Sequence, residues 1–194
     1  WIQEHADLIN QTTPKGTGER DYALLYVTSA LNDKPMPADF PALPFDVTPL
    51  SEKALNSPVF ATGYPAEAML AEGVNAPLLP KQATTTIAQL MTFSSSTVDL
   101  FTIGGTPIGE HGSSGGPVVD AEGKAIGLIS TKGDDTQFGT GSLRAISIPY
   151  IDRTIKEETG FSLKQNLSGN LPYRAQLFKE TIVPLLQNTL KTQI

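Results

Sequence analysis

Residues 112–120 read GSSGGPVVD, and residues 123–130, just beyond a short turn, read GKAIGLIS. Two apolar runs joined by a tight turn, with Gly123 at the position that favours positive φ, are typical of a β-hairpin. The sequence therefore predicts strands at 116–120 and 125–130, with a loop rich in serine and glycine leading into the first.

Short apolar runs separated by turn residues extend this pattern on both sides of the hairpin. They lie at 22–28, 59–65, 84–88, 97–103 and 142–148. Their spacing and their β-branched content predict an all-β barrel or sandwich, in which 22–28 is a buried strand.

The remaining segments do not follow the strand pattern. Residues 32–58 contain six prolines, which predicts a surface connection that is neither helix nor central strand. Residues 150–159 suit a short helix ended by Gly160, and apolar residues at helical spacing predict a helix over 172–193 with a kink at Pro184.

Composition excludes several classes of function. The 194 residues carry a net charge of -6 with scattered Lys and Arg, which argues against a nucleic-acid binder. The absence of cysteine excludes disulfides and thiolate metal sites. No run approaches 18 apolar residues, so no membrane span is expected. Asp134 and Asp135 lack a ligand-spaced partner and 104–106 lacks the phosphate-loop pattern, so neither a metal nor a nucleotide cofactor is expected.

The loop before the hairpin has the residues that acyl transfer needs. Such a reaction requires a hydroxyl on a sharp turn, beside backbone N–H groups aimed at the developing oxyanion. Gly112 turns its N–H inward with no Cβ in the way, and the N–H of Ser114 points in the same direction. Gly115 and Gly116 allow close approach of other backbone. The alternative is a Ser/Gly-rich hairpin loop without chemistry.

Residues 112–117 fit G-x-S-G-G-P, which resembles the nucleophile loop of trypsin-like (chymotrypsin-fold) serine proteases. The hairpin that follows resembles their cysteine-free bacterial branches, the HtrA-like and V8-like proteases. The resemblance covers roughly residues 20–158. It implies an all-β double barrel with the first barrel partial and the second complete. The domains would be a first-barrel remnant with its proline-rich connection (1–58), a second barrel (59–149) and C-terminal helices (150–194).

The resemblance also implies roles for single residues. Ser114 would be the nucleophile, and the amides of Gly112 and Ser114 would form the oxyanion hole. Residues 19–25 look like the family's D-x-A-L-L segment, which gives Asp21 the role of orienting the general base; the alternative is an Asp that caps a turn at a strand start. Ser113 stands where animal trypsins carry Asp, so activation by an ion pair with a new N-terminus is not expected.

The general base has no clear candidate in the chain. His5 precedes Asp21 by 16 residues without the family's sequence context, so it is expected to be a solvated helical-turn residue. His111 would have to fold back across its own turn to reach Ser114, and relatives carry a variable residue there on the lip of the substrate pocket. The catalytic histidine is therefore expected upstream, in a missing N-terminal part of the same protein, and the isolated chain is expected to be inactive.

The resemblance further implies a substrate pocket. Ile108, six residues before the nucleophile, would form an apolar floor, which predicts small or medium apolar side chains at the cleavage site. Ser130, Thr131 and Lys132 would form the opposing wall, where the substrate backbone adds as an antiparallel strand. Lys132 would favour an acidic group nearby or, alternatively, be simply solvated.

The sequence as a whole predicts a serine endopeptidase whose partners are protein or peptide substrates. The family resemblance favours an exported or cell-envelope protein. Two alternatives stay open. One is a catalytically silent peptide-binding module on the same fold, and the other is a structural remnant released by proteolysis.

Overall fold

The computed structural model describes residues 20–30, 34–66, 79–93 and 96–191. Contacts divide the chain into two compact units, one of residues 42–153 and one of residues 1–41 together with 154–194. In the described part of the chain, no helix is both long enough and apolar enough to cross a membrane.

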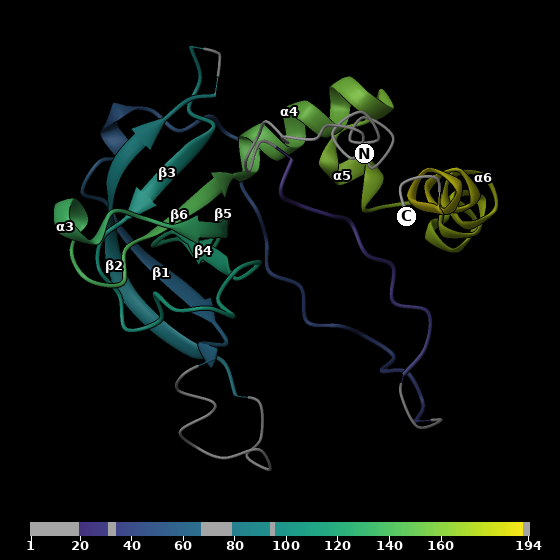
Figure 1. The fold of residues 1–194 in the computed structure, drawn as a ribbon, viewed down its shortest axis with the longest axis horizontal. Coiled ribbons are helices and arrows are strands. Elements are labelled where there is room, and N and C mark those ends of the chain that lie inside the picture. The colour runs from purple at the N-terminus through teal and green to yellow at the C-terminus, as the bar shows by residue number, and fades with distance from the viewer. Residues whose placement is uncertain (1–19, 31–33, 67–78, 94–95, 192–194) are drawn as a thin grey trace. The chain divides into compact units, whose positions relative to one another are not determined.

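The unit of residues 42–153 is a closed antiparallel β-barrel (Figure 1). Around the barrel the strands follow the order β1-β2-β3-β6-β5-β4. The strands are β1 (Pro58–Gly63), β2 (Lys81–Met91), β3 (Leu100–Ile103), β4 (Pro117–Val119), β5 (Ala125–Lys132) and β6 (Leu143–Ser147). A 3-10 turn η2 (Glu52–Ala54) precedes β1, a short helix α3 (Asp135–Phe138) lies between β5 and β6, and α4 (Ile148–Thr159) follows β6.

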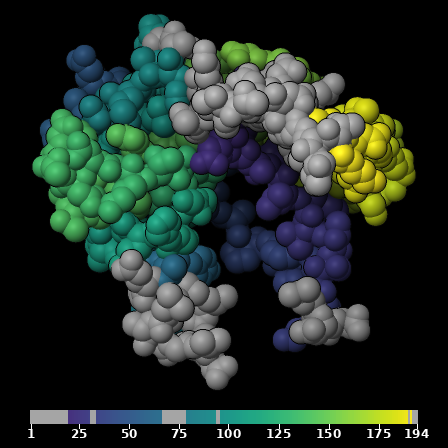
Figure 2. Space-filling view, viewed as in Figure 1, coloured from purple at the N-terminus to yellow at the C-terminus, as the bar shows by residue number. Residues whose placement is uncertain are grey.

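The barrel interior is filled by apolar side chains, most of them small or branched, together with the ring of Phe101. In β1 the residues Val59 and Ala61 point inward while Pro58 and Phe60 are exposed, as the two-residue period of a strand requires. In the space-filling view of Figure 2, side chains cover the strands of the barrel unit. The core cluster comprises Val59, Ala61, Ala83, Ile87, Phe101, Ile103, Ile108, Val118, Ile126, Ile129, Leu143 and Ala145.

The turn of the hairpin between β4 and β5 is stabilised by a side chain within the turn, that of Asp120. Oδ1 of Asp120 accepts hydrogen bonds from the backbone N–H of Glu122 (3.0 Å) and of Lys124 (2.8 Å). Gly123 has φ 80°, in the left-handed region that the sequence predicted for it. The predicted hairpin is confirmed.

A buried carboxylate joins the start of α4 to the barrel. Asp99 is 1% exposed and accepts from Arg153 Nη2 at 2.6 Å, from the backbone N–H of Phe93 at 2.8 Å and from Thr92 Oγ1 at 2.9 Å. Burial by itself raises the pKa of this carboxyl, but the donors, with Arg153 the strongest, outweigh it and hold the pKa below its usual value. Arg153 also lies over the ring of Tyr150.

The other unit contains the rest of α4, the helix α5 (Leu163–Asn166) and the long helix α6 (Leu171–Lys191), with Pro184 inside α6. A capping box starts α5: Ser162 Oγ accepts from the backbone N–H of Gln165, whose side chain accepts from the N–H of Ser162. Near the start of the described chain, Arg20 forms an ion pair with Glu158.

The predicted fold class, an all-β trypsin-like barrel with C-terminal helices, is confirmed. The strand predicted at 22–28 is wrong, because residues 21–30 form no strand and Leu25 is 88% exposed. A strand needs a neighbour to bond its backbone groups, and no described strand pairs with this segment. The proline-rich connection has no α-helix or strand over its described residues 34–57, in agreement with the prediction.

Candidate functional site

The loop of residues 112–116 is held against strand β5 by backbone hydrogen bonds. The N–H of Gly115 donates to the carbonyl of Ile129 (2.7 Å), and the N–H of Ile129 donates to the carbonyl of Gly116 (2.8 Å). A Cβ on Gly116 would lie 1.9 Å from the carbonyl oxygen of Thr62, so only glycine fits there. The loop is therefore fixed to the barrel on the C-terminal side of Ser114.

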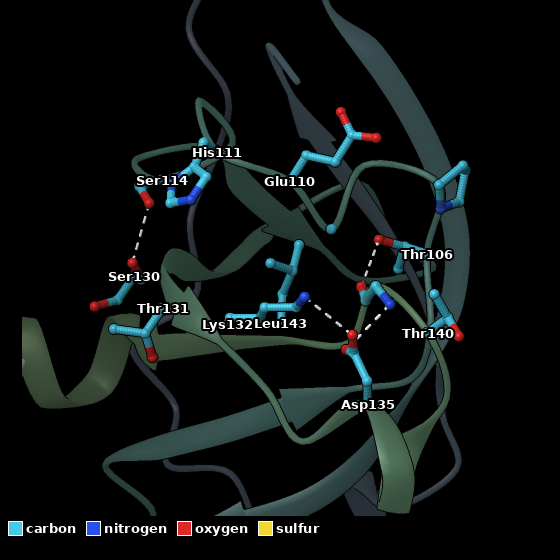
Figure 3. Close-up of a pocket in the computed structure, with 13 residues that line it drawn as sticks. Thr106, Glu110, His111, Ser114, Ser130, Thr131, Lys132, Asp135, Thr140 and Leu143 are labelled. Atoms are coloured by element: carbon cyan, nitrogen blue, oxygen red, sulfur yellow. Dashed lines mark hydrogen bonds and ion pairs between the residues drawn. The ribbon is translucent and has the colours of Figure 1, made fainter. Parts of the chain in front are cut away.

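Ser114 presents its hydroxyl at the surface of this loop. The residue is exposed, and its Oγ donates to the carbonyl of Ser130 at 3.0 Å (Figure 3). Its neighbour Ser113 is 1% exposed and donates from Oγ to the carbonyl of Ile108 at 2.6 Å. Two adjacent serines thus have opposite roles, since one anchors the loop and the other faces solvent.

The peptide between His111 and Gly112 has a fixed orientation. The carbonyl of His111 accepts from the N–H of Ala66 at 2.7 Å. In a trans peptide the carbonyl and the following N–H point in opposite directions, so the Gly112 N–H points away from Ala66. Gly112 has φ 96°, and a Cβ there would lie 2.2 Å from the carbonyl oxygen of Tyr64. Both facts require glycine at this position.

Two amides of the loop are available to a ligand. Within the described ranges, neither the N–H of Gly112 nor the N–H of Ser114 donates to a protein acceptor. Backbone N–H groups next to an exposed hydroxyl can stabilise an oxygen that becomes negative when that hydroxyl attacks a carbonyl. The loop thus has two of the features that acyl transfer requires, an exposed hydroxyl and backbone donors, while a base for the hydroxyl proton is a separate requirement.

A cavity of about 690 Å³ lies beside Ser114. Nine of the thirteen residues that line it have polar or charged side chains (Figure 3). The lining comprises Thr106, Pro107, Gly109, Glu110, His111, Ser114, Ser130, Thr131, Lys132, Asp135, Thr140, Gly141 and Leu143. The structure thus brings the predicted pocket residues His111, Ser130, Thr131 and Lys132 together with Ser114. Ile108 lies elsewhere, since it is 1% exposed within the core cluster and its neighbours Pro107 and Gly109 line the cavity instead.

An ion pair spans part of this cavity. Lys132 Nζ lies 3.0 Å from Asp135 Oδ2, with the lysine side chain 64% exposed. Asp135 Oδ1 accepts from the N–H of Gly141 (3.1 Å), the N–H of Ser142 (3.2 Å) and Ser142 Oγ (3.3 Å). The hydrogen bond from Lys132 is the main cause that lowers the pKa of Asp135. Asp135 therefore holds Gly141 and Ser142, the two residues before β6, in place.

The remaining predicted site residue, Asp21, belongs to the other compact unit. Asp21 is exposed and belongs to the unit of residues 1–41 and 154–194, whereas Ser114 belongs to the barrel unit. His5 lies outside the described residues. In the described ranges no three His, Asp or Glu side chains are grouped in a way that would hold a metal ion.

Sequence reasoning missed the part of the wall that α3 contributes. It treated Asp134 and Asp135 as a solvated loop, whereas Asp134 Oδ1 accepts from the N–H of Thr136 (2.9 Å) and of Gln137 (3.3 Å) and starts α3. An Asp two and three residues before such N–H groups is a helix-start signal that the sequence carries. No signal of that kind pointed to Thr106 or Thr140.

Comparisons with known proteins give a family and several similar folds. The sequence matches the family model described as "Trypsin-like peptidase domain" over residues 3–128. No curated protein matches the chain. The Rv3671c protease of M. tuberculosis is similar in its inactive form (19% identity, TM-score 0.42, 60% of this chain and 55% of that one) and in its active form (18%, 0.42, 59% and 47%). The chain thus spans about half the length of these solved structures.

Proposed function

We propose that this chain, which belongs to the family of trypsin-like peptidase domains, hydrolyses peptide bonds through an acyl-enzyme on Ser114. The observation that supports the proposal most directly is the loop itself. An exposed serine hydroxyl lines a cavity, and the same loop carries two backbone amides, those of Gly112 and Ser114, that donate to no described protein group.

In the proposed mechanism Ser114 Oγ attacks the carbonyl carbon of the scissile peptide. The carbonyl oxygen becomes an oxyanion, which the N–H groups of Gly112 and Ser114 stabilise. Loss of one such donor typically slows acylation by about 10²–10³-fold. The fixed His111–Gly112 peptide means that this donor is already in place before the substrate arrives.

The proton of Ser114 needs an acceptor, and we place it outside this chain. His111 is exposed and lines the cavity. Its described backbone hydrogen bond is the one that its carbonyl accepts from the N–H of Ala66. We assign the base to a histidine that precedes this sequence in the whole protein, and the role of orienting that histidine to Asp21. An acid that orients the imidazole keeps its ring in the tautomer that can take the serine proton.

Substrates of the proposed enzyme are proteins or peptides. Residues 130–132, at the end of β5, line the cavity beside Ser114. A substrate backbone added alongside this segment would bring its scissile carbonyl to the serine loop and one side chain into the cavity.

A second function, that of a peptide-binding module without catalysis, is favoured by one observation. The Ser114 hydroxyl donates to the Ser130 carbonyl, and no described imidazole accepts its proton. The residue at the histidine position in the whole protein distinguishes the two functions, because any other residue there removes the base.

The test is covalent labelling of the full-length protein with a fluorophosphonate, which reacts with activated serines. We expect the wild type to be labelled and Ser114→Ala not to be. Ser168→Ala is the matched control, since Ser168 is an exposed serine of the other unit whose hydroxyl also donates to a carbonyl. Labelling that survives Ser114→Ala would remove Ser114 from the mechanism, and an unlabelled wild type would favour the binding module.

A further inference from the structure

Few ionisable side chains line the cavity beside Ser114, and they differ in direction and in partners. Four ionisable side chains line it: Glu110, His111, Lys132 and Asp135. The carboxylate of Glu110 points away from the other three (Figure 3). The Lys132 ammonium points across the cavity to Asp135, and these two form the ion pair described above.

The two partners of this ion pair differ in how much hydrogen-bonding capacity is left. A carboxylate offers about four lone-pair sites. Asp135 Oδ1 accepts from the N–H groups of Gly141 and Ser142 and from the hydroxyl of Ser142, and Oδ2 accepts from Lys132, so most of its capacity is used. An ammonium has three donors, and Lys132 makes one described contact, to Asp135.

We propose that Lys132 is the specificity-determining residue of this cavity and that it selects an acidic side chain, glutamate or aspartate, on the bound peptide. The proposal rests on the proposed function in one respect, namely that the peptide binds in the cavity beside Ser114. A second carboxylate would join Lys132 without displacing Asp135, because two ammonium donors are left for it.

A lysine or arginine side chain of the bound peptide has no comparable binding position in the cavity. A basic group that approached Asp135 Oδ2 would meet the Lys132 ammonium, which lies 3.0 Å from that oxygen and repels a second positive charge. An apolar side chain would not contact Ile108, the floor that the sequence predicted, because Ile108 lies in the core. The remaining donors of Lys132 are therefore the feature that favours an acidic ligand over the apolar one that the sequence predicted.

The experiment measures binding and so does not depend on catalysis. Fluorescent N-acetylated tetrapeptides that differ only in a C-terminal Glu, Gln or Lys amide are titrated into the 194-residue chain at 0.15 M salt, and fluorescence anisotropy gives Kd. One added charge-assisted contact at an exposed ammonium predicts that the Glu peptide binds about two- to fivefold more tightly than the Gln peptide. The Lys peptide is expected to bind most weakly.

Two variants test whether Lys132 causes the preference. Lys132→Gln removes the charge and keeps the length, and it is expected to make the Glu and Gln peptides bind equally. Lys124→Gln is the matched control, because Lys124 also belongs to the barrel unit and also forms an exposed ion pair, with Asp46 at 3.7 Å, but does not line the cavity. This control should keep the preference for Glu.

The outcomes separate the two proposals. Equal affinity for the Glu and Gln peptides in the wild type, or no binding of either, overturns the role of Lys132. A preference for Glu that persists in Lys132→Gln also overturns it. A preference that depends on Lys132, together with a full-length protein that fluorophosphonate does not label, supports the acidic selectivity and rejects catalysis.

Discussion

The hydroxyl of Ser113 donates a 2.6 Å hydrogen bond to the carbonyl of Ile108, five residues earlier, in the fully buried base of the nucleophile loop. The same carbonyl also accepts from the N–H of Glu110 at 2.8 Å. A side chain that is locked into the barrel thus fixes the backbone next to Ser114. The position for which animal trypsins use a charged anchor is here served by a neutral one.

Ser113→Ala removes this anchor without leaving the Ile108 carbonyl unpaired, because Glu110 still donates to it. We expect the free energy of unfolding to fall by about 1 kcal/mol, the usual value of one hydrogen bond. Fluorophosphonate labelling of Ser114 in the full-length protein should slow, since the loop is less well positioned. Urea titration and labelling rates measure the two effects. The exposed Ser168→Ala should change neither, and unchanged labelling in Ser113→Ala would show that the anchor does not position the nucleophile.

Gly112→Ala tests the oxyanion donor. A Cβ at φ 96° and 2.2 Å from the Tyr64 carbonyl oxygen forces the peptide to rotate, which moves the N–H away from the developing charge. Labelling and peptide hydrolysis by the full-length protein should fall by about 10²–10³-fold. Gly115→Ala is the matched control, because Gly115 also has positive φ (84°) while nothing lies within 4 Å of a Cβ there. If both variants lose the same activity, backbone strain rather than the donor is responsible.

The hairpin after Ser114 was predictable because its turn is determined locally: residues 120–124 are closed by Asp120 itself. The same holds for the helix ended by Gly160, whose φ of 76° matches the prediction. Short-range signals of this kind are present in the sequence itself. The glycines at 112 and 116 were found from their motif, although the backbone oxygens that require them belong to residues 62–64, far earlier in the sequence.

Features that depend on distant residues were not predictable in the same way. The apolar run at 22–28 has strand propensity, but propensity forms no strand unless another strand lies beside it. The position of Ile108 depends on how the loop before Ser113 folds. The hydrogen bond from Ser113 Oγ fixes the carbonyl of Ile108, and the side chain of Ile108 lies in the core. The bracing role of Asp135 arises from Gly141 and Ser142, which the sequence alone does not bring near it.

The assignment of the base outside this chain predicts that the isolated 194 residues hydrolyse peptides negligibly. In the full-length protein, His111→Ala should leave the maximal rate of acylation nearly unchanged, because His111 is a lining residue of the cavity. Its effect should be confined to KM. Rates measured over a range of substrate concentrations separate kcat from KM. Turnover by the isolated chain that disappears in His111→Ala would make His111 the base instead.

The Asp99–Arg153 pair predicts how the barrel responds to acid. The pKa of Asp99 in the folded protein lies below its unfolded value of about 3.9, so its ionised form contributes stability above that pH. This contribution is lost as the pH falls through the lowered pKa, when the carboxyl takes up a proton and its bonds to Arg153 and Phe93 weaken.

Asp99→Asn should therefore lower the free energy of unfolding at pH 7 by on the order of 2 kcal/mol, because the buried site loses its charge-assisted hydrogen bonds. The same variant should lose less stability than the wild type between pH 5 and about pH 2, since it lacks the carboxyl that titrates there. Urea unfolding at several pH values measures both effects. Asp39→Asn, which changes an exposed carboxyl, is the control and should follow the wild type. An Asp99→Asn variant with the wild-type acid profile would show that other carboxylates carry the pH dependence.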